Sequence, residues 1–140
     1  MAERRPVADG LFDWPPGNDA PALLGSGCRV CGETVFPALR DCPLCGTPDT
    51  MDALRLRGAG TLHDFAVAQR GPEGFPVPYV QAYVRLDQGP VIYTLLTDVD
   101  PAEPDVQIGE RMRMVFEDVT TDGEWTLVGW KFRPERGNDV

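Results

Sequence analysis

Four cysteines in two matching segments constrain this chain more than any other feature of its sequence. Each segment reads Cys-x-x-Cys-Gly, and ten residues lie between Cys31 and Cys42. The two-residue spacing lets both sulfurs of a segment reach one ion, and the glycine lets backbone amides turn toward the sulfurs. Two such segments supply a complete tetrahedral ligand set. The sequence therefore predicts a metal site at Cys28, Cys31, Cys42 and Cys45.

Zinc is the expected ion at this site, and iron is its rival. Tetrahedral thiolates hold both metals, and the Cys-Pro-Leu-Cys-Gly segment is also typical of rubredoxin-like electron carriers. No flavin or nicotinamide fingerprint accompanies the cysteines, which favours zinc. Two disulfides would need an oxidising compartment, and no apolar stretch of a secretory signal follows the charged N-terminus. Because four cysteines leave no open coordination position, the predicted role of the metal is folding.

The charge balance argues against two classes of partner. The 140 residues carry a formal net charge of -9, whereas nucleic-acid backbones and anionic membrane surfaces are bound mainly through Lys and Arg. We therefore expect neither nucleic acid nor membrane among the partners. The chain also has no run of about 18 apolar residues, the length needed for a membrane span. A cytoplasmic location is the simplest expectation.

Beyond the cysteines the sequence alternates between apolar and polar residues, as half-buried strands do. In the clearest case the even-numbered residues from Val80 to Leu86 share one face. The expected strands are 61–69, 79–86, 91–97, 111–115 and 125–132. Turn signals lie between them, at Gln88-Gly89 and Asp122-Gly123. Five short strands without an amphipathic helix predict a mainly β fold, an N-terminal rubredoxin-like zinc ribbon followed by a five-stranded OB-fold barrel.

The chain divides into four expected segments. They are an irregular N-terminal arm (1–22), the zinc ribbon (23–50), the OB-fold domain (51–133) and a C-terminal tail (134–140). The arm is rich in proline and glycine, yet it carries the apolar residues Phe12 and Trp14, which a wholly disordered tail rarely does. We expect these two side chains either to pack on their own domain or to dock on a partner.

The sequence offers no recognisable pair of catalytic acid and base. Its single histidine is His63, which the alternation of strand 61–69 places on one face with Phe65 and Val67. A lone histidine in that position is expected to be a packed residue rather than a base. Acyl transfer needs a nucleophile within reach of a base, and the cysteines are committed to the metal. The chain is therefore predicted to bind or to scaffold, without catalysis of its own.

Several stretches in the same order carry a resemblance to a known family, the zinc-ribbon and OB-fold acyl-CoA-associated proteins, first catalogued as a domain of unknown function. The matching segments begin at Cys28 (Cys-Arg-Val-Cys-Gly-Glu-Thr-Val-Phe-Pro), Cys42 (Cys-Pro-Leu-Cys-Gly), Gly58 (Gly-Ala-Gly-Thr-Leu), Pro78 (Pro-Tyr-Val-Gln-Ala-Tyr-Val-Arg-Leu-Asp-Gln-Gly-Pro), Ile108 (Ile-Gly-Glu-Arg-Met) and Val115 (Val-Phe-Glu-Asp-Val). Together they span about residues 20–133. The cysteine segments alone are generic, and their combination with the two later strands is more specific.

The resemblance implies a function that spacing alone does not indicate. Such proteins pack against thiolase-like or aldolase enzymes of lipid metabolism, some of which degrade steroid side chains, and they help form the acyl-CoA channel of the enzyme. The expected assembly is a hetero-oligomer with acyl-CoA at the shared interface. Many relatives carry a longer helical segment before the ribbon, whereas Pro15-Pro16-Gly17 breaks any such helix here. A stand-alone acyl-CoA-binding protein and a rubredoxin-like electron carrier remain as alternatives.

The proline-rich loop 71–78 is the expected contact with the channel or the partner. Its prolines limit flexibility, so ordering the loop on a partner loses less entropy, and its aromatic residues offer apolar contact. The alternatives are that Phe75 plugs its own barrel and that Arg70, rather than meeting a phosphate of coenzyme A, is a solvated charge. The candidate contact residues are Arg70, Phe75, Pro76, Pro78, Tyr79, Phe12 and Trp14.

Overall fold

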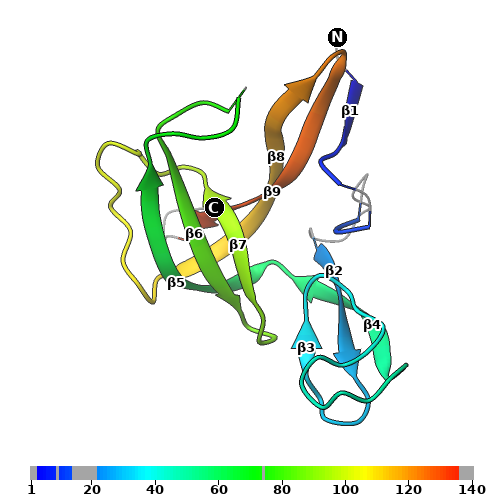
Figure 1. The fold of residues 1–140 in the computed structure, drawn as a ribbon. Helices are drawn as coiled ribbons and strands as arrows, with labels where there is room; N and C mark the ends of the chain where they lie inside the picture. The colour runs from blue at the N-terminus through cyan, green and yellow to red at the C-terminus, as the bar shows by residue number, and fades with distance from the viewer. Residues whose placement is uncertain (1–2, 9, 14–21, 74, 136–140) are drawn as a thin grey trace.

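A computed structural model describes residues 3–8, 10–13, 22–73 and 75–135, and within them every regular element is a strand (Figure 1). No helix in this part of the chain is long and apolar enough to cross a membrane. The strands are β1 (Glu3–Pro6), β2 (Ala22–Cys28), β3 (Thr34–Val35), β4 (Met51–Arg57), β5 (Ala59–Ala68), β6 (Tyr79–Leu86), β7 (Val91–Leu96), β8 (Arg111–Asp122) and β9 (Trp125–Pro134).

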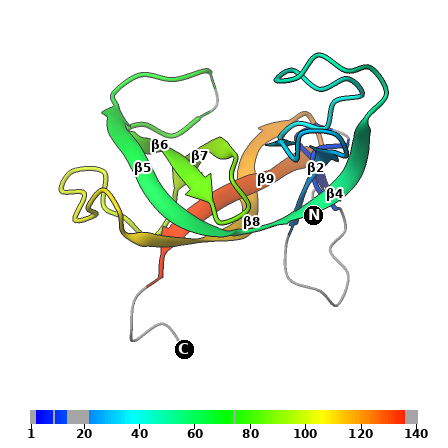
Figure 2. The ribbon, with the colours of Figure 1, turned by 90° about the horizontal axis from the view of Figure 1, so that it is seen from below.

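Strands β5 to β9 close into a five-stranded barrel. Their order is β9-β7-β6-β5-β8, and β8 pairs with β9 to complete the ring. The β7–β9 contact is parallel and the others are antiparallel. This closed Greek-key arrangement is the OB-fold, so the predicted mainly β architecture with a five-stranded barrel is confirmed. Figure 2 shows β9 crossing behind β7, with β4 running into β5 as one long bent strand.

The alternation predicted for 79–86 places its apolar face in the barrel core. Val80, Ala82, Val84 and Leu86 are all buried. They join one continuous cluster with residues of the other strands and of the ribbon: Phe12, Leu23, Leu56, Leu62, Ile92, Leu96, Val106, Met112, Met114 and Phe132. Because ribbon and barrel share this core, the two parts pack as one body.

The prediction that His63 is a packed residue on the same face as Phe65 and Val67 is wrong. The register between β5 and β6 shifts between Leu62 and Asp64, so His63 is the extra residue of a β-bulge. A bulge advances the side-chain alternation by one position. Leu62 is consequently buried, Phe65 packs against the core, and His63 is exposed to solvent.

The long β8–β9 hairpin extends well past the barrel. Strand β8 continues to Asp122, beyond the predicted end of strand 111–115, and a bulge lies between Asp118 and Thr120. The predicted Asp-Gly turn joins the two strands, and Gly123 has a φ of 61°, a conformation in which glycine avoids the Cβ clash. The extra length carries the hairpin beyond the barrel, where β1 pairs with β9.

The N-terminal arm is less irregular than predicted. Strand β1 adds to the outside of the hairpin by pairing in parallel with β9, from Glu3 opposite Trp125 to Pro6 opposite Val128. Farther along, Phe12 bridges to Leu23 and is only 4% exposed. These contacts could not be predicted from the proline- and glycine-rich sequence of the arm. Pairing at the edge of a sheet uses backbone N–H and C=O groups, and almost any sequence supplies them.

The ribbon is a three-stranded antiparallel sheet of order β3-β2-β4. Residues 51–57, which the sequence assigns to the barrel domain, form the third strand of this sheet and pair with β2 along its whole length. Gly58 is the single residue between β4 and β5, and the chain bends where the two strands meet (Figure 1). A division at residue 50 therefore separates the cysteine segments from the strand that supports them.

Candidate metal centre and apolar pocket

The four cysteine sulfurs gather at the tip of the ribbon. All four Sγ atoms lie within 4.8 Å of one another. Cys28 and Cys45 approach to 3.8 Å, and Cys31 and Cys42 to 3.5 Å. A tetrahedral ion with metal–sulfur bonds of about 2.3 Å has sulfurs about 3.8 Å apart. The sulfurs therefore fit one tetrahedral metal ion, as the sequence predicts.

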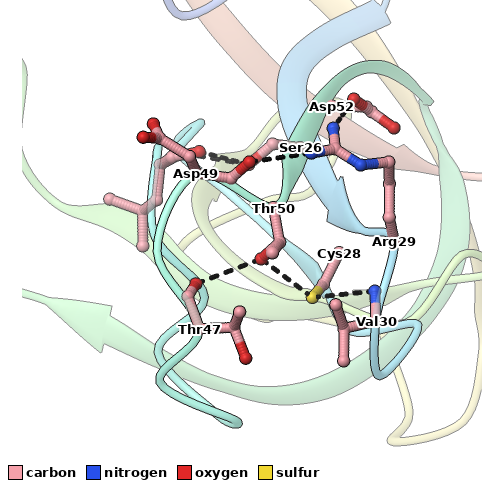
Figure 3. Close-up of polar contacts among 9 residues, drawn as sticks. Ser26, Cys28, Arg29, Val30, Thr47, Asp49, Thr50 and Asp52 are labelled. Carbon is pink, nitrogen blue, oxygen red and sulfur yellow. Dashed lines mark hydrogen bonds and ion pairs between the residues drawn. The ribbon is translucent and has the colours of Figure 1, made fainter.

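Backbone and hydroxyl groups of the ribbon lie close to the sulfurs, and Figure 3 shows those around Cys28. The Val30 N–H donates to Cys28 Sγ at 3.4 Å, and the Cys45 N–H donates to Cys42 Sγ at 3.5 Å. The Thr50 hydroxyl lies 3.3 Å from Cys28 Sγ and 3.1 Å from the Thr47 carbonyl oxygen, so its single proton can be donated to either of them. Such contacts orient the ligands and spread the negative charge of thiolates.

The thiols are electrostatically coupled through their proximity. The Thr50 hydroxyl is the main cause that lowers the pKa of Cys28 to about 6, and Thr47 likewise lowers the pKa of Cys45. At Cys31 the Glu33 N–H favours the thiolate, but burial and the three neighbouring sulfurs outweigh it and raise the pKa to about 12. Four adjacent thiolates need a cation to balance them, which agrees with a metal centre.

Ion pairs and one buried hydroxyl brace the ribbon around the centre. Arg29 pairs with Asp52 at 2.5 Å and donates to the Asp49 carbonyl at 2.8 Å (Figure 3). The buried Ser26 hydroxyl accepts from the Leu39 N–H at 3.0 Å and donates to the Leu39 carbonyl at 3.2 Å. Ser26 is thus a structural residue. The four sulfurs lie close enough together to act as the ligands of one ion.

An apolar pocket of about 310 Å³ opens on the barrel wall, away from the cysteines. The proline-rich loop, the middle of β7 and the β8–β9 hairpin surround it. Its lining is Val7, Pro72, Phe75, Tyr79, Tyr93, Thr94, Leu95, Val119, Gly129 and Trp130. The face of the second and third barrel strands, here β6 and β7, is where OB-folds commonly bind ligands.

Trp130 connects this pocket to the ribbon. Its indole N–H donates to the Tyr93 carbonyl at 3.0 Å, which holds the ring at the pocket wall. The same ring meets Phe36 of the ribbon edge-on at 5.6 Å and Phe12 of the N-terminal arm at 6.1 Å. The three segments therefore support one aromatic wall, and the folding of the ribbon influences the shape of the pocket.

Two tyrosines continue the aromatic surface beyond the pocket. Tyr83 and Tyr93 face each other across β6 and β7 with ring centroids 5.6 Å apart, and both are almost half exposed. The Tyr93 hydroxyl donates to Gln81 at 3.0 Å, and burial, followed by the neighbouring tyrosines, raises its pKa. The phenol therefore stays protonated at neutral pH.

The predicted contact residues divide into three groups. Phe75 and Tyr79 line the pocket together, which places the loop at a hollow of the surface. Arg70, Pro76 and Pro78 are exposed and lie outside the lining.

The two aromatic residues of the N-terminal arm form the remaining group. Phe12 packs against Phe116 with ring centroids 4.8 Å apart and is buried in its own domain. That it contacts a partner stays a prediction. Trp14 lies outside the described residues.

Sequence reasoning missed the deeper part of this pocket. Tyr93, Trp130 and Val7 come from three strands that are distant in the chain, and only the closed sheet brings them together. The alternation of β7 places Tyr93 on the outer face, so an exposed aromatic residue there was a usable signal. Val7 gave no signal, because its position depends on the addition of β1 to β9.

No acid–base pair emerges from the described part of the chain. His63 is exposed, and none of the ion pairs formed there involves it. Lys131 pairs with Glu117 at 3.4 Å on the hairpin. Neither residue lines the apolar pocket.

Comparison with known proteins assigns the chain to a family. A DUF35 domain-containing scaffold protein of Methanothermobacter thermautotrophicus is 33% identical over 117 residues, which is 81% of this chain and 86% of that protein. The chain belongs to the DUF35 domain-containing scaffold protein family. In agreement, the family model described as ChsH2, C-terminal OB-fold domain, matches residues 55–117.

Two further relatives of this DUF35 protein carry informative names. A solved structure titled Ltp2-ChsH2(DUF35) aldolase has a chain that superimposes with a TM-score of 0.65 at 29% identity, covering 81% of this chain and 84% of that one. The benzoylsuccinyl-CoA thiolase subunit BbsA of Thauera aromatica is 31% identical over 86 residues, 61% of this chain and 59% of that protein. These findings agree with the predicted resemblance.

Proposed function

We propose that this DUF35 protein is a non-catalytic subunit that binds a thiolase-fold enzyme and helps form its acyl-CoA channel. The observation that carries the proposal is the apolar pocket beside the proline-rich loop, because it offers an aromatic, concave surface without a catalytic pair. Buried aromatic residues are the usual anchors of protein interfaces. The relatives support the choice of partner, since one is a thiolase subunit and another is part of an aldolase.

Within this function the loop 71–78 forms the wall nearest to the partner. Phe75 is half-buried and Val77 is 48% exposed, so the loop presents apolar side chains to solvent in the free chain. Covering them removes apolar surface from water, which favours association. A wall of this kind also keeps water from a thioester at the partner's active site.

The metal of the ribbon is zinc in this proposal. Four thiolates suit zinc and iron alike, and the chain has no second redox group among its described residues that would use iron. A colourless protein with one zinc per chain supports the assignment. A red protein with visible absorbance and bound iron would instead favour the rubredoxin-like alternative.

Replacing Phe75 by Ala tests the docking role of the pocket. The chain is first purified with the untagged proteins that accompany it, and the thiolase-fold partner is identified by mass. Phe75→Ala is expected to weaken that complex by about 2 kcal/mol or more, the size typical of an interface anchor, with metal content unchanged.

Ile108→Ala is the matched control, because Ile108 is 61% exposed and lies outside the pocket. It should leave affinity and partner activity at the wild-type level. Equal affinity of the Phe75→Ala and wild-type chains would remove the loop from the interface.

A stand-alone acyl-CoA-binding protein is the second candidate, because about 310 Å³ is within the range of small-ligand pockets. Titration of the isolated chain with an acyl-CoA separates the two functions. Tight binding without any partner favours the stand-alone protein, and binding only in the complex favours the subunit.

A further inference from the structure

A second hollow, of about 970 Å³, lies where the ribbon joins the barrel. It follows the bend at which β4 runs into β5 (Figure 2) and is bounded on the other side by β8. The hollow shares no lining residue with the aromatic pocket. It is therefore a separate feature, at the junction of the two parts of the molecule.

Three arginines project from the strands that line this hollow. Arg55 and Arg57 are two residues apart on β4, so both side chains point to the face opposite the buried Leu56. Arg113 stands directly opposite Ala59 across the β5–β8 pairing, which makes it the diagonal neighbour of Arg57. Diagonal residues of this kind are about 7–8 Å apart. The arginines thus converge on one surface.

Two of these arginines are free to meet a ligand. Arg55 already forms an ion pair with Asp13. The guanidinium groups of Arg57 and Arg113 have no ion-pair partner among the residues that the structure describes, although the chain holds 22 acidic residues against 13 Lys and Arg. Among the residues that the structure describes, no acidic side chain lines the hollow. In an acidic protein, this local excess of positive charge marks an anion-binding surface.

Small residues give the hollow its floor. Ala53 and Ala59 flank the bend, and Gly58 sits where β8 comes closest, with its carbonyl accepting from the Met114 N–H at 2.7 Å. A Cβ at Gly58 would stand 2.3 Å from the Met114 Cβ, so glycine is required for this approach. Apart from the three arginines, every residue that lines the hollow is apolar.

We propose that this hollow binds a nucleotide diphosphate, with Arg57 and Arg113 on the phosphates. Arginine pairs with phosphate oxygens two at a time through its planar fork, and two guanidinium groups set diagonally across strands suit two linked phosphates. A volume near the upper end of small-ligand sites is more than inorganic phosphate fills. The apolar floor accepts the flat base.

This ligand could reach the site from two sources with the same chemistry. One is a free nucleotide, and the other is the nucleotide end of coenzyme A, whose thioesters are the substrates under the proposed function. The inference about the hollow does not depend on a partner enzyme. The isolated chain is therefore the right material for the test, and a failure here would leave the proposed subunit function untouched.

Titration of the full chain by calorimetry and by amide NMR tests the site. The probes are ADP, coenzyme A, pyrophosphate and adenosine. ADP is expected to shift the amides of residues 53–59 and 113–115 saturably, pyrophosphate to bind more weakly at the same amides, and adenosine to give no response. Binding of coenzyme A tighter than ADP identifies the coenzyme as the source, and equal binding identifies a free nucleotide.

The double variant Arg57→Gln/Arg113→Gln should bind ADP at least about tenfold more weakly, as expected for the loss of charge-assisted hydrogen bonds. Arg40→Gln is the matched control, since Arg40 is exposed in the ribbon and lies outside the hollow. Thermal melts verify that each variant is folded. Absence of saturable ADP shifts, or undiminished ADP affinity in the double variant, would overturn the proposal. So would a hexaglutamate peptide that matches ADP in affinity at these amides, which would indicate docking of an acidic protein surface.

Discussion

At the scale of single residues, four cysteine sulfurs define the candidate metal centre of the ribbon. Spacing in the sequence was enough to predict that Cys28, Cys31, Cys42 and Cys45 share one ion, because two short segments leave the sulfurs few other arrangements. The supporting hydroxyl of Thr50 could not be predicted in the same way, since it reaches Cys28 from 22 residues away. Its position depends on how β4 folds back along β2.

Replacing Cys42 by Ser should abolish metal binding and unfold the ribbon. Cys42 is buried at 2% exposure and lies 3.5 Å from the Cys31 sulfur, so a hydroxyl there is neither a good ligand nor a free surface group. Binding of a structural metal is itself folding free energy. Metal analysis by mass spectrometry should fall from about one ion per chain to almost none, with loss of dispersed ribbon signals in the amide spectrum.

Leu44→Ala is the control for that variant, because Leu44 lies in the same cysteine segment and is 68% exposed. It should keep both the metal and the ribbon signals. A Cys42→Ser chain with full metal content and an intact ribbon spectrum would contradict the assignment of the centre.

The ion pair between Asp87 and Arg111 should make a small, pH-dependent contribution to stability. Two contacts of 2.8 Å join the groups, and the guanidinium holds the pKa of Asp87 below its ordinary value of about 3.8. A depressed carboxyl pKa stabilises the fold above the unfolded value, and this stabilisation is lost as the pH falls through the folded value.

Arg111→Gln should therefore lower the free energy of unfolding at pH 7 by about 0.5 kcal/mol, the size of an exposed pair, and by less below pH 3.8. Carboxyl NMR titration checks the cause, because the variant should return the pKa of Asp87 to its ordinary range. An unchanged Asp87 titration in the variant would show that the pair has no electrostatic effect.

At the scale of strands and turns, the alternation of apolar and polar residues could be read from the sequence. The pairing register between strands could not. The pattern of 79–86 predicted β6 correctly, since both of its neighbours bury the same face. The Gln88-Gly89 signal indicated a short turn but left its length open. The Leu86 N–H donates to the Pro90 carbonyl, so the loop holds three residues, and this length places Tyr83 opposite Tyr93.

The bulge at His63 is a second feature of register that the sequence did not predict. An extra residue in one strand changes which side chains face the core, and nothing in the local composition of β5 announces it. Similarly, β1 and the far half of β8 depend on backbone pairing with β9, which exists only once the barrel has closed. These features follow from tertiary contacts rather than from local preference.

Gly60→Ala should destabilise the barrel by about 2 kcal/mol or more. Gly60 lies where β5 passes β6, and a Cβ there would stand 2.2 Å from the Arg85 carbonyl oxygen. This oxygen belongs to the backbone, so a change of side-chain rotamer cannot relieve the clash. Overpacking of this kind forces strands apart. Urea unfolding measures the loss.

Gly27→Ala provides the comparison, because its Cβ would meet the Leu54 side chain at an ordinary 3.6 Å. Both glycines are in strands, so the two substitutions share the same change in backbone entropy. Similar stability of the two variants would contradict the close approach of β5 and β6.

At the scale of the whole molecule, one continuous core joins ribbon, arm and barrel. Trp130 lines the pocket on the barrel wall and contacts Phe36 of the ribbon, so the ribbon packs against the pocket wall. The sequence predicted the two parts and their order. It could not predict that they share an aromatic wall, because the wall is assembled from the ribbon, the arm and β9.

The central claim is that this chain supports acyl-CoA chemistry in a partner and performs none itself. Thioester turnover, assayed for the isolated chain, for the purified thiolase-fold partner and for their complex, tests it most directly. No turnover is expected from the isolated chain, and the highest turnover is expected from the complex. Turnover of an acyl-CoA by the isolated chain alone would contradict it.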